Sequence, residues 1–297
     1  MQFHLFLPQM RMTHDAIVDR ALAAESAGFD GIAFMDHLAP PMADSQPMWE
    51  AMEIAGWVLA RTTTLRVSHL VLCDSFRNPA VLARQVVSLD HASGGRFELG
   101  IGWGSVPDEL HTFGVGSTEP RVRVSRLGES LQILGALWSG DPLDFDGEHF
   151  TLVGAQQRPV PTSPITTTIG GTGPKTLDLV RQHAQWWNLP VHQLDRLELL
   201  RERAGDARAS VQLMVALLAS ESDRAAVTQT VMGRYGADGL GSMVVIGTVD
   251  ELVDHISGLA DRGVERVYPW FADFAPVETL ARFAAVIAGA GQAGVAP

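Results

Sequence analysis

The sequence predicts a parallel α/β barrel built from eight strand–helix units, a (β/α)8 TIM barrel, and three observations lead to this fold class. The chain has 297 residues, close to the roughly 250 that one such barrel takes. Short apolar runs alternate with amphipathic stretches from end to end, which is typical of βαβ units. Counting the runs gives about eight strands. We therefore expect a single domain over residues 1–297, with a doubly wound open sheet as the alternative.

Four units are expected in the N-terminal half. Their strands are predicted at residues 3–7, 31–35, 65–72 and 97–100. Thr13 is the expected N-cap of the first helix, and Gly28 stands where a helix commonly ends on a left-handed residue. Asn78 and Pro79 open the third helix with an N-cap and a proline at the first helical position. A helix near residues 47–61 and a long one near 120–138 complete this half.

The C-terminal half continues the rhythm after one interruption. Its strands are predicted at residues 165–169, 185–189, 211–218 and 266–271. The interruption, at about 141–163, contains a hairpin around Asp146-Gly147 and a proline-rich linker, so we expect an insertion outside the barrel before strand five. Thr248 and Glu251 form a capping box. A loose tail is expected at about 290–297.

Composition narrows the classes of partner. The formal net charge of −12 argues against nucleic acid, since phosphate binding requires a basic surface. No apolar run approaches the roughly 18 residues of a membrane span, and the first residues lack the features of a signal peptide. The single cysteine fits a reducing compartment. These features predict a cytoplasmic protein that acts on a small molecule.

In such a barrel the working residues follow the strands at the C-terminal face. Polar, aromatic and glycine residues converge there in this sequence. The candidates are Gln9, Asp36, His37, Cys73, Asp74, Gly102, Trp103, Gly104, Gly170, Gly171, Trp187, Asn188 and Trp270.

The glycine-rich stretch after strand five is the sharpest local feature. Residues 170–173 read Gly-Gly-Thr-Gly, and Pro174 then opens a helix. Backbone N–H groups at such a helix start, unhindered by side chains, can bind an anion, and Lys175 adds a positive charge. We therefore expect Gly170, Gly171, Thr172, Gly173 and Lys175 to bind a phosphate. The alternative is a tight turn with an incidental lysine.

His37 is the best candidate for proton transfer, because imidazole titrates near neutrality and His37 stands beside Asp36 at a strand end. A structural histidine is an equal alternative. Glu109 could act as an acid or orient the substrate, although solvated helix carboxylates are commoner. The histidines show no HExxH spacing, so no metal is expected. There is no G-x-S-x-G motif, and Cys73 has no evident base partner.

Several blocks of the chain resemble the luciferase-like monooxygenase superfamily. They include "FHLFLPQ", "AESAGFDGIAFMDH", "SFRNPAVLARQVVSLDHASGGRFELGIGWG" and "IGGTGPKTLDLVRQHAQWWN". Two features, "LVLCDSFRNP" and "IGGTGPKTL", resemble most closely the members that use the deazaflavin coenzyme F420. The resemblance implies a luciferase-like TIM barrel and hydride transfer with coenzyme F420. The alternatives are an FMN-dependent monooxygenase, which uses reduced flavin and oxygen, and a non-catalytic flavin-binding protein.

The resemblance also assigns roles to residues. His37 matches the active-site histidine, residues 170–173 match the phosphate loop, and Trp187-Asn188 match the conserved end of strand six. It further implies a non-prolyl cis peptide after strand three, placed here at Cys73–Asp74. Gln185-Trp186 and Ser105 depart from the family pattern and leave the proton donor open. Family analogy and the apolar stretch at 48–59 predict a homodimer.

Overall fold

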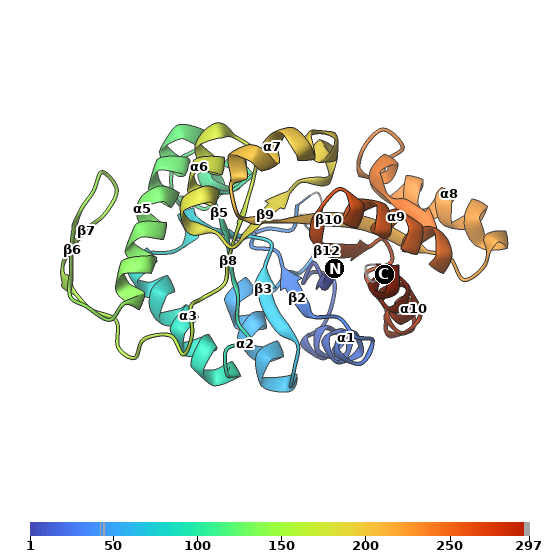
Figure 1. Cartoon of the computed structure of the whole chain (residues 1–297), viewed down its shortest axis with the longest axis horizontal. Helices are drawn as coiled ribbons and strands as arrows, with labels where there is room; N and C mark the ends of the chain where they lie inside the picture. Colours follow the sequence, from blue (N-terminus) through green and yellow to red (C-terminus); the bar gives the residue numbers. More distant parts are fainter. Residues whose placement is uncertain (42, 44, 294–297) are drawn as a thin grey trace.

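The computed structural model describes residues 1–41, 43 and 45–293. Its main sheet is parallel and runs in the order β3-β2-β1-β12-β10-β9-β8-β5-β4, with β11 beside β10. These strands lie in the middle of the molecule and helices surround them (Figure 1). Their bounds are Gln2–Phe6 (β1), Gly31–Phe34 (β2), Arg66–His69 (β3), Leu72–Cys73 (β4), Leu99–Gly102 (β5), Thr167–Gly170 (β8), Trp186–Leu189 (β9), Arg208–Leu217 (β10), Val245–Gly247 (β11) and Val264–Phe271 (β12).

The two ends of this sheet are halves of one strand. β3 pairs with β2, with Arg66 opposite Gly31, whereas β4 pairs with β5, with Leu72 opposite Ile101. Only two residues separate β3 from β4, so the sheet nearly closes on itself as a barrel. With β3 and β4 counted as strand three, the predicted barrel is confirmed and the open-sheet alternative is wrong. The short strand β11 was not predicted.

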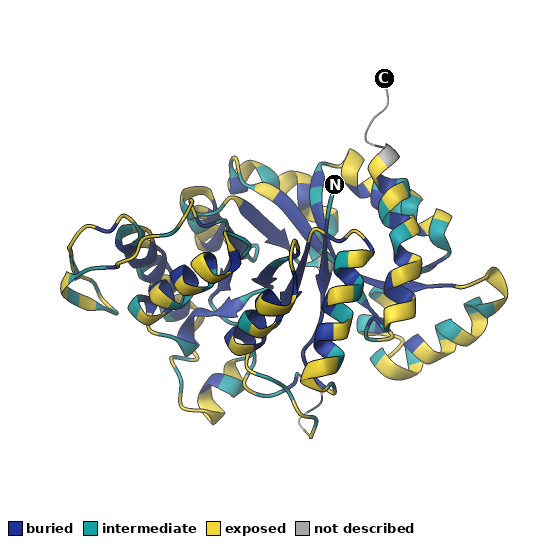
Figure 2. Ribbon diagram, turned by 90° about the horizontal axis from the view of Figure 1, so that it is seen from below, coloured by how far each residue is buried: buried dark blue, intermediate teal, exposed yellow. Residues whose placement is uncertain are grey.

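Helices cover the outer face of the sheet, with their exposed sides turned to solvent (Figure 2). The longer ones are His14–Ser26 (α1), Ala51–Arg61 (α2), Pro79–Ser93 (α3), Pro107–Thr112 (α4), Pro120–Trp138 (α5), Pro174–His183 (α6), Leu197–Ala204 (α7), Arg224–Tyr235 (α8), Val249–Asp261 (α9) and Val277–Ala293 (α10). Short 3-10 turns occupy Asp74–Phe76, Val191–Arg196, Glu221–Asp223 and Leu240–Met243. The Thr13 cap, the Asn78-Pro79 start and the Thr248–Glu251 capping box are all present.

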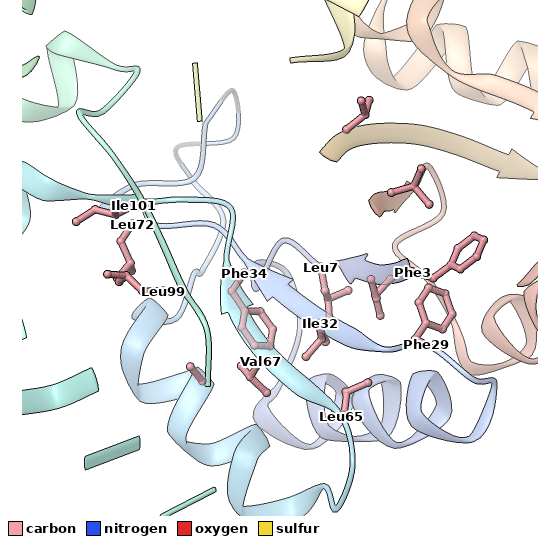
Figure 3. Close-up of a cluster of buried hydrophobic side chains, with 14 of the residues drawn as sticks. Phe3, Leu7, Phe29, Ile32, Phe34, Leu65, Val67, Leu72, Leu99 and Ile101 are labelled. Carbon is pink, nitrogen blue, oxygen red and sulfur yellow. The ribbon is translucent and has the colours of Figure 1, made fainter. Parts of the chain in front are cut away.

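The main hydrophobic core lies between the sheet and these helices. Successive residues of a barrel strand alternate between the outside and the inside. Phe3, Ile32, Val67 and Leu99 accordingly belong to the outer core (Figure 3). Burial of such side chains contributes about 25 cal/mol per Å² of apolar surface.

The N-terminal ends of the strands hold a buried ion pair. Arg266 and Glu98 are each at most 3% exposed at the side chain, and their closest N–O distance is 2.7 Å. The Arg266 guanidinium lies 3.9 Å from the centre of the Trp186 ring. Trp186, which departs from the family pattern, therefore packs at the end of the barrel opposite the predicted site. Burial lowers the pKa of His4 well below its ordinary value, helped by Arg266 and Arg66, so this imidazole is neutral.

Four local expectations need correction or completion. The non-prolyl cis bond is Leu70–Val71, at the junction of β3 and β4, rather than Cys73–Asp74. Strand four is shifted, since Phe97 makes only an isolated bridge with Val67. The predicted hairpin is present as Leu143–Asp146 (β6) and Thr151–Ala155 (β7), away from the barrel. Helix α10 continues past residue 290, where the loose tail was expected, and residues 294–297 lie outside the described part.

Candidate active site

A cavity of about 440 Å³ opens at the carboxyl ends of the strands, where the sequence placed the site. We call it the first cavity. Of the predicted site residues, it is lined by Asp36, His37, Cys73, Gly102, Trp103, Glu109, Gly170, Gly171 and Asn188. Its volume is in the range of small-molecule sites.

Glycines allow one wall of the first cavity to pack closely. A Cβ at Gly102 would lie 2.8 Å from the Val71 side chain, and one at Gly104 would lie 2.8 Å from the Cys73 sulfur. Gly171 has a φ of +125°, a conformation that side chains rarely adopt. These residues therefore form a closely packed wall without side chains of their own, against which a flat ring can lie.

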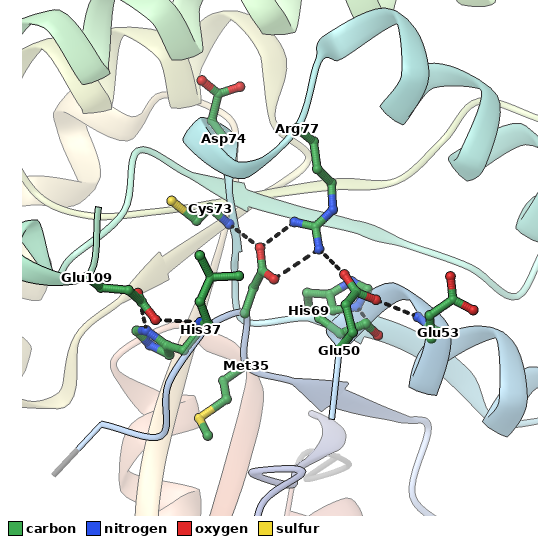
Figure 4. A network of polar contacts seen from close by, with 12 residues as sticks. Met35, His37, Glu50, Glu53, His69, Cys73, Asp74, Arg77 and Glu109 are labelled. Carbon is green, nitrogen blue, oxygen red and sulfur yellow. Dashed lines mark hydrogen bonds and ion pairs between the residues drawn. The ribbon is translucent and has the colours of Figure 1, made fainter. Parts of the chain in front are cut away.

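His37 and Glu109 meet at the edge of the first cavity, although 72 residues separate them (Figure 4). The distance from His37 Nδ1 to Glu109 Oε2 is 3.0 Å. The other carboxylate oxygen accepts hydrogen bonds from the backbone N–H groups of Leu38 and Ala39. Only 8% of the Glu109 side chain is exposed, so Glu109 is not the solvated helix carboxylate that the sequence favoured.

Asp36, after strand two, binds residues of strand three and the turn that follows it. Its carboxylate accepts the backbone N–H of Cys73 at 2.7 Å and forms an ion pair with Arg77 (Figure 4). Arg77 also pairs with Glu50, which caps α2 through the Glu53 N–H. The sequence analysis did not identify Arg77. The available signal was a basic residue just after strand three, three positions beyond the acidic Asp74.

Cys73 and Asp74 have different surroundings. The Cys73 thiol lines the first cavity, and burial raises its pKa to about 11, so it is protonated at neutral pH. Asp74 lies outside the cavity, buried in an ion pair with Arg126. Asp74, a candidate from its place after strand three, therefore contacts α5 rather than the first cavity.

Trp103 forms a wall of the first cavity and is anchored on both sides. Its indole N–H donates to the Thr176 hydroxyl at 3.2 Å. The Arg123 guanidinium lies 4.7 Å from the ring centre and donates to the Gly104 carbonyl at 3.0 Å. The ring is thus held between α5 and the start of α6.

Only the first two residues of the glycine-rich loop line the first cavity. Gly170 and Gly171 line the cavity, whereas Thr172, Gly173 and Lys175 do not. Gly173 is the N-cap of α6, and Lys175 is exposed in its first turn. The first N–H groups of a helix have no intrahelical partners. In this loop they lie at the Gly173 end, where α6 begins.

Trp187 and Asn188 point in opposite directions, as neighbours on a strand must. Asn188 lines the first cavity and lies 3.3 Å from the Ser210 hydroxyl. Trp187 is fully buried in the outer core, and its indole N–H donates to the Gly171 carbonyl at 2.8 Å. Trp187 therefore does not line the first cavity, and its ring supports the glycine loop instead.

A second cavity, of about 340 Å³, adjoins the first. The two share His37, Leu70 and Gln212. Gln212 was missed by the sequence analysis, although a single polar residue at an inward position of the apolar run 211–218 was a usable signal. Trp270, expected at the end of strand eight, lines this second cavity.

Comparison with known proteins identifies similar chains. Residues 1–236 match the family described as luciferase-like monooxygenase. An F420-dependent glucose-6-phosphate dehydrogenase of Mycolicibacterium fortuitum is 36% identical over 163 residues, which are 53% of this chain and 48% of that protein. One of Nocardia farcinica is 34% identical over 160 residues, again 53% and 48%. The chain thus matches about half the length of these curated relatives.

Solved structures share the fold at low sequence identity. An F420-dependent secondary alcohol dehydrogenase in complex with an F420-acetone adduct has a TM-score of 0.82 at 18% identity, covering 97% of this chain and 98% of that one. An EDTA monooxygenase from Chelativorans has a TM-score of 0.81 at 16% identity, covering 100% and 95%.

Two kinds of feature are absent from the described residues. No helix among them is both long and apolar enough to cross a membrane. Within the same residues, no group of three or more His, Cys, Asp or Glu side chains is placed to hold a metal ion.

Proposed function

The chain belongs to the luciferase-like monooxygenase family, and from this premise we propose that it is an oxidoreductase that transfers hydride between coenzyme F420 and a small organic substrate. The observation that carries the proposal is the His37–Glu109 pair at the edge of a glycine-walled cavity. The relatives named as F420-dependent dehydrogenases support the choice of cofactor.

The residues of the first cavity fit a flat cofactor ring. Gly102 and Gly104 let their backbone pack against Val71 and Cys73, where a Cβ would clash, and Trp103 supplies an aromatic wall. Asn188 adds a polar contact, and residues 170–173 with Lys175 would hold the phosphate. Coenzyme F420, when bound, would supply a carbon that accepts or donates a hydride.

His37 would exchange the proton that accompanies the hydride. An ionised Glu109 can only accept hydrogen bonds. Nδ1 of His37 therefore carries the proton and donates a hydrogen bond to Glu109. Nε2 is then the basic nitrogen, free to take the proton of a substrate hydroxyl, or to return it to a carbonyl oxygen in the reverse direction. Glu109 acts through His37 and is a positioning residue.

Titration with each cofactor tests this proposal. The protein should bind coenzyme F420 with a shifted absorbance spectrum, and the bound cofactor should be reduced by a substrate alcohol. Binding of FMN in place of F420, with oxygen consumption, would instead establish the monooxygenase alternative. Binding without turnover on any substrate would favour the non-catalytic alternative.

We further propose that residues 1–297 fold as one domain, that the protein is cytoplasmic, and that it forms a homodimer through the first helices. Trp57 on α2 and Val81 on α3 are 47% and 55% exposed, and large apolar side chains on a surface are candidates for a subunit interface. Sedimentation at micromolar concentration should give twice the 32.0 kDa of the chain. A monomer would contradict the dimer, and Trp57→Arg should dissociate it.

A further inference from the structure

We propose that the second cavity is the substrate site, and that it takes a small, mainly apolar compound with one oxyanion group, which Arg11 and Arg234 bind. The oxyanion is a carboxylate or a phosphate ester. The inference rests on the proposed function for the cofactor in the first cavity. It adds the chemical class of the substrate.

The position of the second cavity suits a substrate. It shares His37, Leu70 and Gln212 with the first cavity. A compound in it would therefore meet a ring in the first cavity beside the imidazole that exchanges the proton. Its volume of about 340 Å³ is near the lower end of the range for small-molecule sites, which favours a compact substrate.

Most of the second cavity is apolar or aromatic. The apolar and aromatic lining residues are Phe6, Pro8, Met10, Met35, Pro41, Ala43, Leu70, Tyr235, Trp270 and Phe274. Trp270 packs edge-on against Phe6, with ring centres 5.5 Å apart. A sugar would leave most of its hydroxyl groups without partners against these side chains, at a cost for each one. An apolar substrate body meets no such cost.

Two arginines line this cavity and lie near one aromatic ring, and Arg234 also donates a hydrogen bond to the Ala272 carbonyl. Arg11 follows β1 and Arg234 belongs to α8, yet their guanidinium carbons lie 5.9 and 5.7 Å from the centre of the same Phe274 ring. Within the described residues, neither forms an ion pair with a carboxylate. On a chain with a net charge of −12, two cations beside an apolar cavity are matched to an anionic group.

The backbone at this site is held in uncommon conformations. Arg11 and Phe274 have φ angles of 59° and 64°, and within the described residues the only other non-glycine residue with a positive φ is Ala275. Such conformations persist where surrounding contacts enforce them, and they gather at ligand sites. The Arg11 N–H donates to the Pro47 carbonyl at 3.0 Å, and the Phe274 carbonyl accepts from Arg20 at 2.9 Å. Arg11 and the Phe274 ring are therefore carried by a preorganised frame.

Three alcohols of one shape test the class of substrate. They are 4-(hydroxymethyl)benzoate, its phosphate ester analogue 4-(hydroxymethyl)phenyl phosphate, and the neutral 4-methylbenzyl alcohol. Glucose 6-phosphate serves as an anionic polyol. In the reaction, the alcohol carbon loses a hydride to oxidised coenzyme F420 and its hydroxyl loses a proton to His37, which leaves the aldehyde. Calorimetry measures binding without cofactor, and cofactor absorbance measures turnover.

We expect one or both anionic aryl alcohols to bind at least tenfold more tightly than the neutral alcohol. The stronger of the two identifies the oxyanion. Arg11→Gln and Arg234→Gln should each reduce that preference about tenfold or more, the size of one charge-assisted hydrogen bond, with little effect on the neutral alcohol. Arg203→Gln, an exposed arginine on α7 outside both cavities, is the matched control.

Equal binding of the neutral and anionic alcohols would overturn the proposal, as would an anion preference that survives both arginine substitutions. Tighter binding of glucose 6-phosphate than of the aryl anions would overturn the claim that the substrate body is mainly apolar. Arginine-dependent binding of an aryl anion without F420 reduction would leave the site standing and place the failure in the proposed function.

Discussion

At the scale of single residues, the site depends on one pair that is distant in sequence. His37 follows β2 and Glu109 belongs to α4, yet Glu109 holds both the imidazole and the backbone N–H groups beside it. This carboxylate therefore fixes the ring and the loop that carries it. In the proposed function, His37 meets the substrate and Glu109 orients His37.

Substitution of these two residues should separate turnover from cofactor binding. His37→Ala should slow kcat by about 10² to 10⁴, the contribution of a proton-transferring group, with the cofactor Kd near wild type. Glu109→Gln should slow kcat less, because the amide oxygen can still accept a hydrogen bond. His111→Ala, an exposed histidine on the same helix, should leave kcat unchanged. If His37→Ala lost cofactor binding and kept its kcat, the proton-transfer role would be refuted.

At the scale of elements, the turn between β8 and α6 packs against β9 and also lines the first cavity. Gly171 bonds through its N–H to the Asn188 carbonyl and through its carbonyl to Trp187. These two hydrogen bonds hold the Gly171 backbone in a conformation that favours glycine. Gly171 also lines the first cavity.

We expect Gly171→Val to abolish cofactor binding. A Cβ there would lie 3.2 Å from the Thr176 side chain, on a backbone with φ of +125°, so the loop would have to move. Lys175→Ala should weaken binding by about 1–2 kcal/mol, the scale of one charge-assisted hydrogen bond. Cofactor Kd is the measurement, and circular dichroism checks the fold. Normal binding by a folded Gly171→Val protein would place the phosphate site elsewhere.

Helix α1 is tied to the start of strand three by one carboxylate. Glu25 accepts hydrogen bonds from the backbone N–H groups of Thr63, Thr64 and Leu65 at 2.6–2.9 Å. Burial would raise the pKa of Glu25, but these bonds outweigh it and lower the pKa to about 2. The stabilisation is therefore complete above the ordinary value of 4.5 and is lost as pH falls toward about 2.

Glu25→Gln should lower the free energy of unfolding at pH 7 by about 1–2 kcal/mol, the size of hydrogen bonds to a charged group discounted for partial exposure. The difference from wild type should shrink as pH falls from 4.5 to about 2, because Glu25 is protonated first in the unfolded state and only near pH 2 in the folded state. Urea unfolding at several pH values measures it. A difference that stays constant down to pH 2 would contradict the assignment to ionised Glu25.

At the scale of the whole molecule, a buried ion pair connects strands on opposite sides of the barrel interior. Arg266 on β12 binds Gln2 at the start of β1 and Glu98 just before β5. β1 is the neighbour of β12, whereas β5 lies on the far side of the sheet order, so the Arg266–Glu98 pair connects opposite walls at the end away from the site.

Breaking this pair should destabilise the entire barrel. Glu98→Gln leaves Arg266 buried without its carboxylate, which typically costs about 3–5 kcal/mol. The exposed pair Arg208–Glu265 offers a matched control, because its side chains are 47% and 45% exposed. Glu265→Gln should cost no more than about 1 kcal/mol. Urea midpoints at constant slope give both values, and equal costs would show that burial of the pair does not govern stability.

The sequence by itself determined the barrel, its order of strands and helices, and the residues at the strand ends. Hydrophobic periodicity and helix caps are local signals, and Thr13, Asn78-Pro79 and Thr248–Glu251 carry them within a few residues. Asp36, His37, Gly170 and Gly171 were placed at the site because parallel strands bring their carboxyl ends together.

The tertiary structure decided which side chains face the cavities and which meet. A one-residue difference in position sends Trp187 into the outer core and Asn188 into the first cavity. The junction of β3 and β4, which carries the cis bond, depends on pairing with two different strands. The His37–Glu109 and Asp36–Arg77 contacts join residues 72 and 41 positions apart. Such distances leave no periodic trace in a single sequence, because only the closed chain brings these residues together.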